Sequence, residues 1–269
     1  MTVEETAADC ETVEVTVGDH ADFVATVAID RPEARNALNA QVRTELTQVF
    51  ETIPDSEVRV VVLTGAEGTG AFVAGADVTE LRERDVLEQR EASKRPRVYE
   101  TVADCPMPVI ARINGHALGG GCELAQACDV RLARADAKLG HPEITLGIMP
   151  GGGGTQRLVR LVGEGQAMRL VLSGEVIDAE EAADIGLVEE VHPEGAFDDR
   201  VYDLASAMAG HSPVALEFAK KSVRAASRMG LDEGIEYEAE LFAQLFATHD
   251  KDEGIDAFLE DRDPEWRGE

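Results

Sequence analysis

The sequence predicts an α/β fold built from repeated β-β-α units and completed by a region made only of helices. Short apolar runs typical of buried strands alternate with helical patterns over the first 200 residues, and strands followed by helices favour a layered core. From Phe197 onward the pattern is almost wholly helical. We therefore expect a core domain over residues 1–200 and a helical region over residues 201–269.

The first expected elements are a β-hairpin and a helix. Val13–Val17 alternates apolar and acidic residues, Gly18-Asp19-His20 offers a turn, and Phe23–Ile29 runs apolar. Asn39 is a residue type that favours helix N-caps, and residues 40–52 repeat apolar side chains at helical spacing. The chain is thus expected to open with two strands and then a helix.

The rest of the core is expected to alternate strands, loops and helices. Val58–Thr64 predicts a buried strand, followed by a glycine-rich loop over residues 65–75. A charged helix is expected from near Thr79 until Pro96 breaks it. Further strands are expected at 108–113 and 129–133, and helices at 122–127, from near 155, and at 197–209, 213–229, 231–247 and 251–260.

Composition and charge exclude several classes of protein. Hydrophobic residues make up 44% of the 269 residues, which rules out general disorder. The 53 acidic and 25 basic residues give a net charge of −28, which repels nucleic acid phosphates and anionic lipids. Because the acids are spread along the chain and Arg outnumbers Lys, we interpret the charge as adaptation to high salt. An ordinary acidic cytosolic protein is the alternative.

Cysteine usage indicates a reducing compartment, and hydropathy indicates neither a signal peptide nor a membrane span. The four cysteines, at positions 10, 105, 122 and 128, are too few and too irregular for a disulfide scaffold. Residues 1–14 are acidic and lack the apolar core of a signal peptide. No run of 18 apolar residues occurs. We expect a cytoplasmic protein without a membrane span.

Two glycine clusters are candidate sites of close backbone approach. Gly119–Gly121 does not form the GxGxxG pattern of a dinucleotide fold, and Gly151–Gly154 lacks the Lys-Ser/Thr of a P-loop. Backbone N–H groups at the start of a helix remain, and these suit a developing oxyanion. The alternative is a tight turn that needs only a positive φ angle.

Two acidic residues lie close to these clusters in sequence. Glu123 follows Gly119–Gly121, and Glu143 stands in the His-Pro-Glu-Ile segment that begins at His141. In apolar surroundings the pKa of a carboxyl rises, so two such groups could share a water molecule for acid–base chemistry. The alternative is that each is a surface or N-cap acid. No HxxxH, CxxC or GxSxG pattern occurs, so we expect no metal site and no hydrolase serine.

At these residues the sequence resembles the enoyl-CoA hydratase/isomerase (crotonase) superfamily. The resemblance extends over roughly residues 13 to 265. The segments that carry it are Arg31-Pro-Glu-Ala-Arg-Asn-Ala-Leu-Asn39, Phe72-Val-Ala-Gly-Ala-Asp77, Ile113-Asn-Gly-His-Ala-Leu-Gly-Gly-Gly-Cys-Glu-Leu-Ala125, Leu139-Gly-His-Pro-Glu-Ile144 with the glycine run after it, and the segment from Phe246 to Arg262.

The resemblance implies a fold and an assembly. The family fold is the crotonase (ClpP-like) spiral of repeated β-β-α units with a helical C-terminal region, and members usually form homotrimers or homohexamers made of two trimers. Residues 201–269 would then serve oligomerisation, which agrees with the apolar side chains that the acidic C-terminal helices carry.

The resemblance also implies a chemistry. Family members hold the enolate of an acyl-CoA thioester in an oxyanion hole, here the N–H groups of Ala76 and Gly120. Hydratases carry both glutamates, so Glu123 is expected to deprotonate the water that attacks C3 and Glu143 to deliver the proton at C2. The implied activity is enoyl-CoA hydration. The alternatives are enoyl-CoA isomerisation, 3-hydroxyacyl-CoA dehydration, or a non-catalytic RNA-associated homologue, which the charge disfavours.

Coenzyme A is expected as part of the substrate, and no separate cofactor is implied. By resemblance, the CoA-binding residues are Arg35, Ala37, Leu38, Ala74, Asp77, Gly119 and Arg262. Asp77 has an alternative role as the cap of the following helix. Many relatives carry lysine near the C-terminus where this chain has Asp261 and Asp263, so phosphate binding is expected to depend on Arg262.

Overall fold

The computed structural model describes residues 2–269, and two β-sheets lie at its centre. The larger has the strand order β1-β2-β3-β5-β7-β10. β1 and β2 form the antiparallel hairpin expected from the sequence, and the other neighbours pair in parallel. The strands are β1 Val13–Val17, β2 Val24–Ile29, β3 Val60–Gly65, β5 Val109–Ile113, β7 Val130–Arg134 and β10 Glu190–His192.

A smaller sheet lies beside it, with the order β4-β6-β8-β9. Its strands are β4 Ala71–Val73, β6 His116–Leu118, β8 Lys138–Gly140 and β9 Val176–Asp178. β4 falls in the loop expected over residues 65–75, and β6 falls between the strand expected at 108–113 and the helix expected at 122–127, so the sequence predicted neither strand. Three-residue strands surrounded by glycine leave too short an apolar pattern to be recognised. In three successive units the chain passes from a strand of the large sheet to a strand of the small one, namely β3 to β4, β5 to β6 and β7 to β8.

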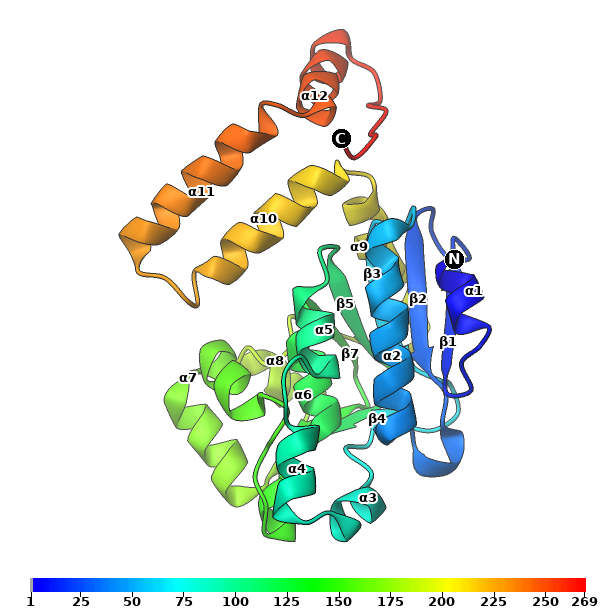
Figure 1. Ribbon diagram of the computed structural model, residues 1–269, viewed down its shortest axis with the longest axis vertical. Coiled ribbons are helices and arrows are strands. Elements are labelled where there is room, and N and C mark those ends of the chain that lie inside the picture. Colours follow the sequence, from blue (N-terminus) through cyan, green and yellow to red (C-terminus); the bar gives the residue numbers. More distant parts are fainter. Residues whose placement is uncertain (1) are drawn as a thin grey trace.

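Helices cover both faces of the large sheet (Figure 1). Apolar residues of α9, among them Phe197 and Val201, pack on one face. The other face packs under α2, α5 and α6 in a single continuous core. The helices before residue 213 are α1 Val3–Ala7, α2 Ala40–Thr52, α3 Val78–Glu83, α4 Val86–Ala92, α5 Val98–Asp104, α6 Gly120–Ala127, α7 Gly154–Ser173, α8 Ala179–Asp184 and α9 Glu194–Ala209, with 3-10 turns η1 Pro32–Ala34, η2 Ile53–Asp55 and η3 Pro142–Leu146.

Helix starts follow local chemistry. Asn39 caps α2 as expected, because its Oδ1 accepts a hydrogen bond from the N–H of Val42 at 2.8 Å. The charged helix expected from Thr79 to Pro96 is instead two helices, α3 and α4. Asp85 separates them by capping α4 through the N–H groups of Leu87 and Glu88. A side chain that competes for backbone donors favours a new helix start over a continuous helix.

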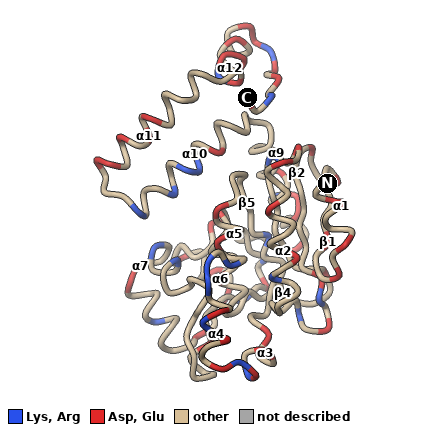
Figure 2. The backbone as a smooth tube through the Cα atoms, viewed as in Figure 1, with Lys and Arg blue, Asp and Glu red and all other residues tan. Residues whose placement is uncertain are grey.

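The last three helices, α10 Pro213–Ala225, α11 Leu231–Leu245 and α12 His249–Glu260, extend away from the sheets (Figure 1). α10 ends earlier than the Met229 expected. Acidic residues are spread over most elements and line α11 (Figure 2). Six large apolar side chains of α11 and α12 are nevertheless exposed, namely Leu231, Ile235, Phe242, Ile255, Phe258 and Leu259. None of the helices in residues 2–269 is long and apolar enough to cross a bilayer.

Candidate active site

Glycines bring the N-terminus of α6 against the small sheet. Gly119, which precedes α6, has φ +50°, and its N–H donates to the carbonyl of Gly140 at 2.9 Å. A Cβ on Gly121 would lie 2.0 Å from the carbonyl oxygen of Val73, a distance that no side chain permits. The backbone at the start of α6 therefore touches β4 directly, which only glycine allows.

Two backbone N–H groups meet beside this helix start. Leu38 pairs with Ala76 by donating to the carbonyl of Gly75 at 2.8 Å and accepting from Asp77 at 2.9 Å. This pairing directs the N–H of Ala76 away from Leu38. Gly120 is the first residue of α6, so its N–H has no acceptor within the helix. The Cβ position of Gly120 lies 3.2 Å from the nitrogen of Ala76, so both donors border one small space.

Glu123 lies one turn into α6 and is almost fully buried, with an exposed fraction of 3%. Its Oε1 accepts hydrogen bonds from the N–H groups of Gly152 at 2.6 Å and Gly154 at 2.8 Å. Burial raises the pKa of Glu123 and the nearby Glu143 carboxylate raises it further, whereas the two amides and His141 lower it. The net pKa lies above the usual value, so this carboxyl is suited to exchange a proton.

The glycine run after η3 is required by the packing around Glu123. A Cβ on Gly154 would lie 2.9 Å from Glu123 Oε1, and one on Gly152 would lie 2.5 Å from the ring of Tyr99. The phenol oxygen of Tyr99 lies 3.0 Å from the Cβ position of Gly120. Tyr99 therefore spans the distance between the glycine run and the paired N–H groups.

Glu143 approaches the same space from η3. Its carboxyl lies 3.2 Å from the Cβ position of Gly119, directly before the α6 start. Both carboxylate oxygens are buried and neither has a hydrogen-bond partner among residues 2–269. A buried polar group without a partner is costly, and its orientation toward the space beside α6 is suited to a substrate or water.

His141 connects the two carboxylates. It is fully buried, its Nε2 pairs with Gln126 Nε2 at 2.8 Å, and its Nδ1 lies 3.6 Å from Glu143 Oε1. The Cε1 of His141 and the Cγ of Glu123 both lie within 3 Å of the Cβ position of Gly154. Burial lowers the pKa of His141, but Cys122 and Glu143 raise it, with a net increase to about 10.

The comparisons with known proteins agree with this geometry. The sequence model described as enoyl-CoA hydratase/isomerase matches residues 19–269. The chain is 44% identical to 2,3-dehydroadipyl-CoA hydratase of Escherichia coli K12 over 90% of this chain and 94% of the relative. It is 42% identical to short-chain-enoyl-CoA hydratase of Clostridium acetobutylicum, over 89% and 92%.

A solved structure supports the same conclusion. The crystal structure of enoyl-CoA hydratase from Bacillus anthracis superimposes with a TM-score of 0.91 at 38% identity, covering 96% of this chain and 100% of that one. The chain belongs to the enoyl-CoA hydratase/isomerase family. The expected α/β crotonase spiral with its helical C-terminal region is thereby confirmed. The division at residue 200 and the roles of individual site residues stay predictions.

Within this family member, the two segments expected to bind CoA lie side by side. The carbonyl of Arg35 accepts from the N–H of Ala74 at 3.1 Å, and Leu38 pairs with Ala76 as described above. Arg35 is exposed, whereas the side chain of Leu38 is completely buried. Both backbone groups of Leu38 are already hydrogen-bonded to Gly75 and Asp77, so within this chain Leu38 shapes the site rather than offering a free group to a ligand. The carbonyl of Ala37 accepts from Arg31 at 3.2 Å.

Asp77 has the capping role that the sequence left open. Its Oδ1 accepts from the N–H of Thr79 at 3.0 Å at the start of α3, and its Oδ2 pairs with Arg31 at 2.7 Å. These hydrogen bonds hold the pKa of Asp77 at about 2. The carboxylate is thus already fully engaged within the chain.

Arg262 lies far from the other residues expected to bind CoA. It follows α12, at the opposite end of the molecule from α3 and β4 (Figure 1), and it pairs with Glu253 at 2.6 Å and Glu260 at 2.7 Å. These two carboxylates raise the pKa of Arg262 and neutralise its charge locally. Within a single chain, Arg262 therefore does not join the site beside α6.

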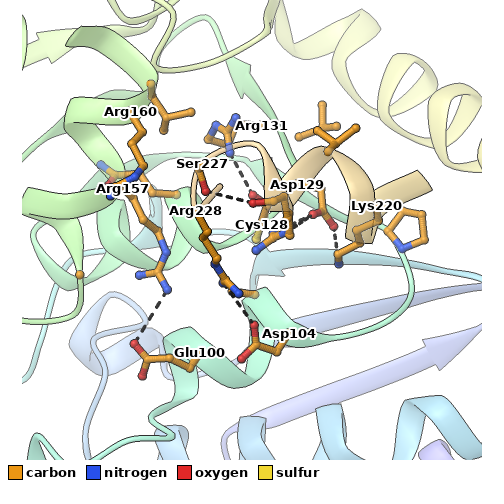
Figure 3. A pocket seen from close by; sticks show the side chains of 18 of the residues that line it. Glu100, Asp104, Cys128, Asp129, Arg131, Arg157, Arg160, Lys220, Ser227 and Arg228 are labelled. Atoms are coloured by element: carbon orange, nitrogen blue, oxygen red, sulfur yellow. Dashed lines mark hydrogen bonds and ion pairs between the residues drawn. The ribbon is translucent and has the colours of Figure 1, made fainter. Parts of the chain in front are cut away.

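A cavity of about 850 Å³ lies elsewhere, between α10 and the core (Figure 3). Its wall includes Gln126, Gly153 and Arg157, but neither Glu123 nor Glu143. It is therefore adjacent to the back of the glycine run rather than part of the two-carboxylate site. No group of three or more His, Cys, Asp or Glu residues within residues 2–269 is placed to hold a metal ion.

The sequence reasoning missed Tyr99, His141 and Gln126, and it expected close backbone approach at the second glycine run without naming the group that approaches. A tyrosine in a short helix gives no periodic signal that distinguishes it from core. The four consecutive glycines were a usable signal, because such a run in a buried segment implies a contacting group that excludes Cβ atoms. That group is the Glu123 carboxylate together with the Tyr99 ring.

Proposed function

We propose that this chain is an enoyl-CoA hydratase, a lyase of fatty acid metabolism that reversibly adds water in a syn manner to a trans-2-enoyl-CoA and yields the 3-hydroxyacyl-CoA. The observation that carries the proposal is the convergence of two buried carboxylates, Glu123 and Glu143, on the space that the N–H groups of Ala76 and Gly120 border. The named relatives are hydratases of the same chemical class.

The paired amides act on the thioester. When the N–H groups of Ala76 and Gly120 donate to the thioester oxygen, they polarise the conjugated double bond and stabilise the enolate that forms as C3 is attacked. Each donor is fixed before the substrate arrives, one by the Leu38 pairing and one by the α6 start. Preorganised donors of this kind each lower the barrier by about 3–4 kcal/mol.

The two glutamates move the protons. Glu123, held by two amides, orients the water and accepts its proton as oxygen bonds to C3. Glu143, whose oxygens have no partner within residues 2–269, delivers a proton to C2. Because the carboxylates are electrostatically coupled, they titrate as a pair rather than as two independent groups.

The decisive experiment is to mix the protein with crotonyl-CoA in high salt and follow the loss of the conjugated thioester absorbance, with chromatography to identify the product. Glu123→Gln and Glu143→Gln are each expected to lower kcat by about 10³-fold or more while binding of 3-hydroxybutyryl-CoA is kept. Glu51→Gln, an exposed acid of α2, is the matched control. Near-normal turnover in either site variant contradicts the mechanism, and a shifted double bond without a hydroxyl group indicates isomerisation.

The remaining features of the proposal concern CoA, assembly and environment. The segments around Arg35 and Ala74 are the proposed CoA contacts, with Arg262 available only if another copy brings it near. A homotrimer or homohexamer is supported by the exposed apolar side chains of α11 and α12, whose exposure to water costs about 25 cal/mol per Å². Light scattering tests the assembly. A cytoplasmic location and adaptation to high salt are proposed from the thiol usage and the net charge of −28.

A further inference from the structure

The glycine run that binds Glu123 contains peptide groups that glycine leaves free to rotate. Gly153 has φ +104°, and neither Gly152 nor Gly154 carries a side chain to restrict the backbone. Rotation of a single peptide plane would turn an N–H away from Glu123 and present a carbonyl oxygen to its carboxylate instead. Something outside the run must therefore fix these planes if Glu123 is to keep both donors.

Each of the three peptide groups is fixed at its carbonyl. The carbonyl of Gly151 accepts from Arg97 Nη1, and the carbonyl of Gly152 accepts from Arg157 Nη1 at 2.9 Å. The carbonyl of Gly153 accepts from the backbone N–H of Arg157 at 2.9 Å, in the first turn of α7. The third plane is thus held by the helix itself, whereas the first two depend on arginine side chains.

The Gly151–Gly152 peptide lies between opposite charges. In a planar trans peptide the C=O and N–H point in opposite directions. Arg97 donates to the C=O on one side, and the N–H on the other side donates to Glu123 Oε1 at 2.6 Å. Hydrogen bonds in such a chain polarise one another, so the guanidinium strengthens the donor that stabilises the Glu123 carboxylate.

The arginines are themselves positioned by one acid. Glu100 of α5, whose side chain is 6% exposed, receives Arg97 at 2.9 and 2.6 Å in a two-point contact. Arg157 lies 3.9 Å from the same carboxylate, and Figure 3 shows its side chain extending from α7 toward Glu100. Arg95 also lies 3.6 Å from Glu100, but its side chain is 69% exposed. Among described residues, Arg95 makes no hydrogen bond to the glycine run.

We propose that Arg97 is a positioning residue for Glu123, and that it acts by locking the Gly151–Gly152 peptide group so that the N–H of Gly152 points at the carboxylate. Arg157 holds the next peptide group, whose N–H belongs to Gly153 and makes no hydrogen bond to Glu123 among the described residues. Neither arginine touches the space beside Ala76 and Gly120. The proposal deepens the hydratase function and rests on it for the kinetic part of its test. Its spectroscopic part depends only on the contact between Glu123 and the glycine run.

The test compares Arg97→Met with Arg95→Met, which removes a cation beside the same Glu100 without touching the run. Arg97→Met is expected to lower kcat on crotonyl-CoA by about tenfold to 100-fold, the loss expected for one hydrogen bond to a charged group, with little change in KM. Because Glu123 loses stabilisation of its ionised form, the acidic limb of the pH–rate profile is expected to move to higher pH. Arg95→Met is expected to keep the wild-type kcat and profile.

A direct titration separates this proposal from the proposed function. The infrared band of the protonated Glu123 carboxyl, assigned by its loss in Glu123→Gln, reports the pKa of Glu123 without turnover. A raised pKa in Arg97→Met supports the positioning role even if the wild type fails to hydrate crotonyl-CoA. An unchanged pKa and kcat in Arg97→Met overturns it. If Arg97→Met does not fold, Arg97→Lys is measured instead, with a smaller shift in the same direction expected and identical behaviour to wild type counting against the proposal.

Discussion

The Nδ1 atom of His141 lies 3.6 Å from Oε1 of Glu143, and neither atom has a hydrogen-bond partner among residues 2–269. His141 is fully buried, so water does not reach the imidazole to stabilise a charge. Cys122 and the Glu143 carboxylate raise the pKa of the ring against the effect of burial. The Gln126 amide lies 2.8 Å from the other ring nitrogen, and because a protonated ring donates from both nitrogens, it requires this amide to turn its partnerless Oε1 toward Nε2. The histidine and the glutamate thus form one electrostatic unit.

This relationship predicts how stability depends on pH. The pKa of His141 is raised to about 10 from its ordinary value of about 6.5. A group whose pKa is raised on folding contributes stability that is fully present below the unfolded pKa and is lost as the pH rises through the folded pKa. The difference in unfolding free energy between wild type and His141→Gln should therefore be largest at pH 6.5 or below and shrink toward pH 10.

Urea unfolding at fixed protein concentration across this pH range provides the measurement. His211→Gln removes an exposed histidine, so it should leave the wild-type stability unchanged at every pH. A difference for His141→Gln that stays constant from pH 6 to pH 10 would show that the imidazole is neutral in the folded protein.

A methyl group at Gly154 should damage the site more than the fold. The added Cβ would lie 2.9 Å from Glu123 Oε1 and 2.8 Å from His141 Cε1, so the carboxylate must move. A displacement of about 1 Å at a catalytic group lowers rates by about 100-fold, and we expect that loss in kcat for Gly154→Ala.

The second segment of α7 offers a comparison. Gly165 lies just beyond the break that Gly163 makes in α7 with φ +77°, and a Cβ there meets nothing within 4 Å. Gly165→Ala should keep full activity and raise the stability by about 0.5–1 kcal/mol, because alanine has the higher helix propensity. Crotonyl-CoA kinetics and thermal melts of Gly154→Ala and Gly165→Ala test both expectations. Equal activity in the two variants would contradict the proposed geometry around Glu123.

The features on which these predictions depend are not equally predictable from the sequence. The hairpin, α2 with its Asn39 cap and the buried strands were predictable because apolar periodicity and capping act over a few neighbouring residues. β4 and β6 were not, because they consist of three residues each and are stabilised by pairing with distant strands. Local patterns do not encode such pairing partners.

The candidate site shows the same contrast. Spacing alone left Glu123 and Glu143 as ordinary acids, and only the resemblance joined them to Ala76 and Gly120. The hydrogen bonds from Gly152 and Gly154 to Glu123 join residues about 30 positions apart. The hydrogen bond from Arg97 to the carbonyl of Gly151 joins residues 54 positions apart. Contacts at such separations follow from packing and have no signature in neighbouring residues.

A methyl group at Gly120 should obstruct the paired amides. The added Cβ would lie 3.2 Å from the nitrogen of Ala76 and 3.0 Å from the phenol oxygen of Tyr99, within the space proposed for the thioester oxygen. Loss of one oxyanion donor costs about 10²–10³ in kcat, and Gly120→Ala is expected to lose at least that much. Tyr99→Phe in the same chain relieves only the contact with the hydroxyl, so the double variant should stay slow.

The neighbouring glycine separates this effect from misfolding. Gly121→Ala places a Cβ 2.0 Å from the carbonyl of Val73, so it should prevent α6 from docking on β4 and reduce the yield of folded protein. Circular dichroism and crotonyl-CoA assays distinguish a folded, inactive Gly120→Ala from an unfolded Gly121→Ala. Recovery of activity in Gly120→Ala with Tyr99→Phe would mean that the hydroxyl contact, not the amide space, matters.

The acidic surface predicts that salt stabilises the fold. The net charge is −28, and α11 carries Asp232, Glu236 and Glu240 on one exposed face at four-residue spacing. Like charges at that spacing destabilise a helix by about 0.2–0.5 kcal/mol per pair, and the screening length falls from about 10 Å at 0.1 M to about 3 Å at 1 M salt. The melting temperature should therefore rise between 0.1 and 2 M KCl.

A triple variant, with Asp232→Asn, Glu236→Gln and Glu240→Gln, should be more stable than wild type in dilute buffer and gain less from KCl, because it has less repulsion to screen. Melting curves of both proteins over the KCl series test this, and a wild-type melting temperature that is flat or falls with salt would remove the salt-adapted interpretation of the charge.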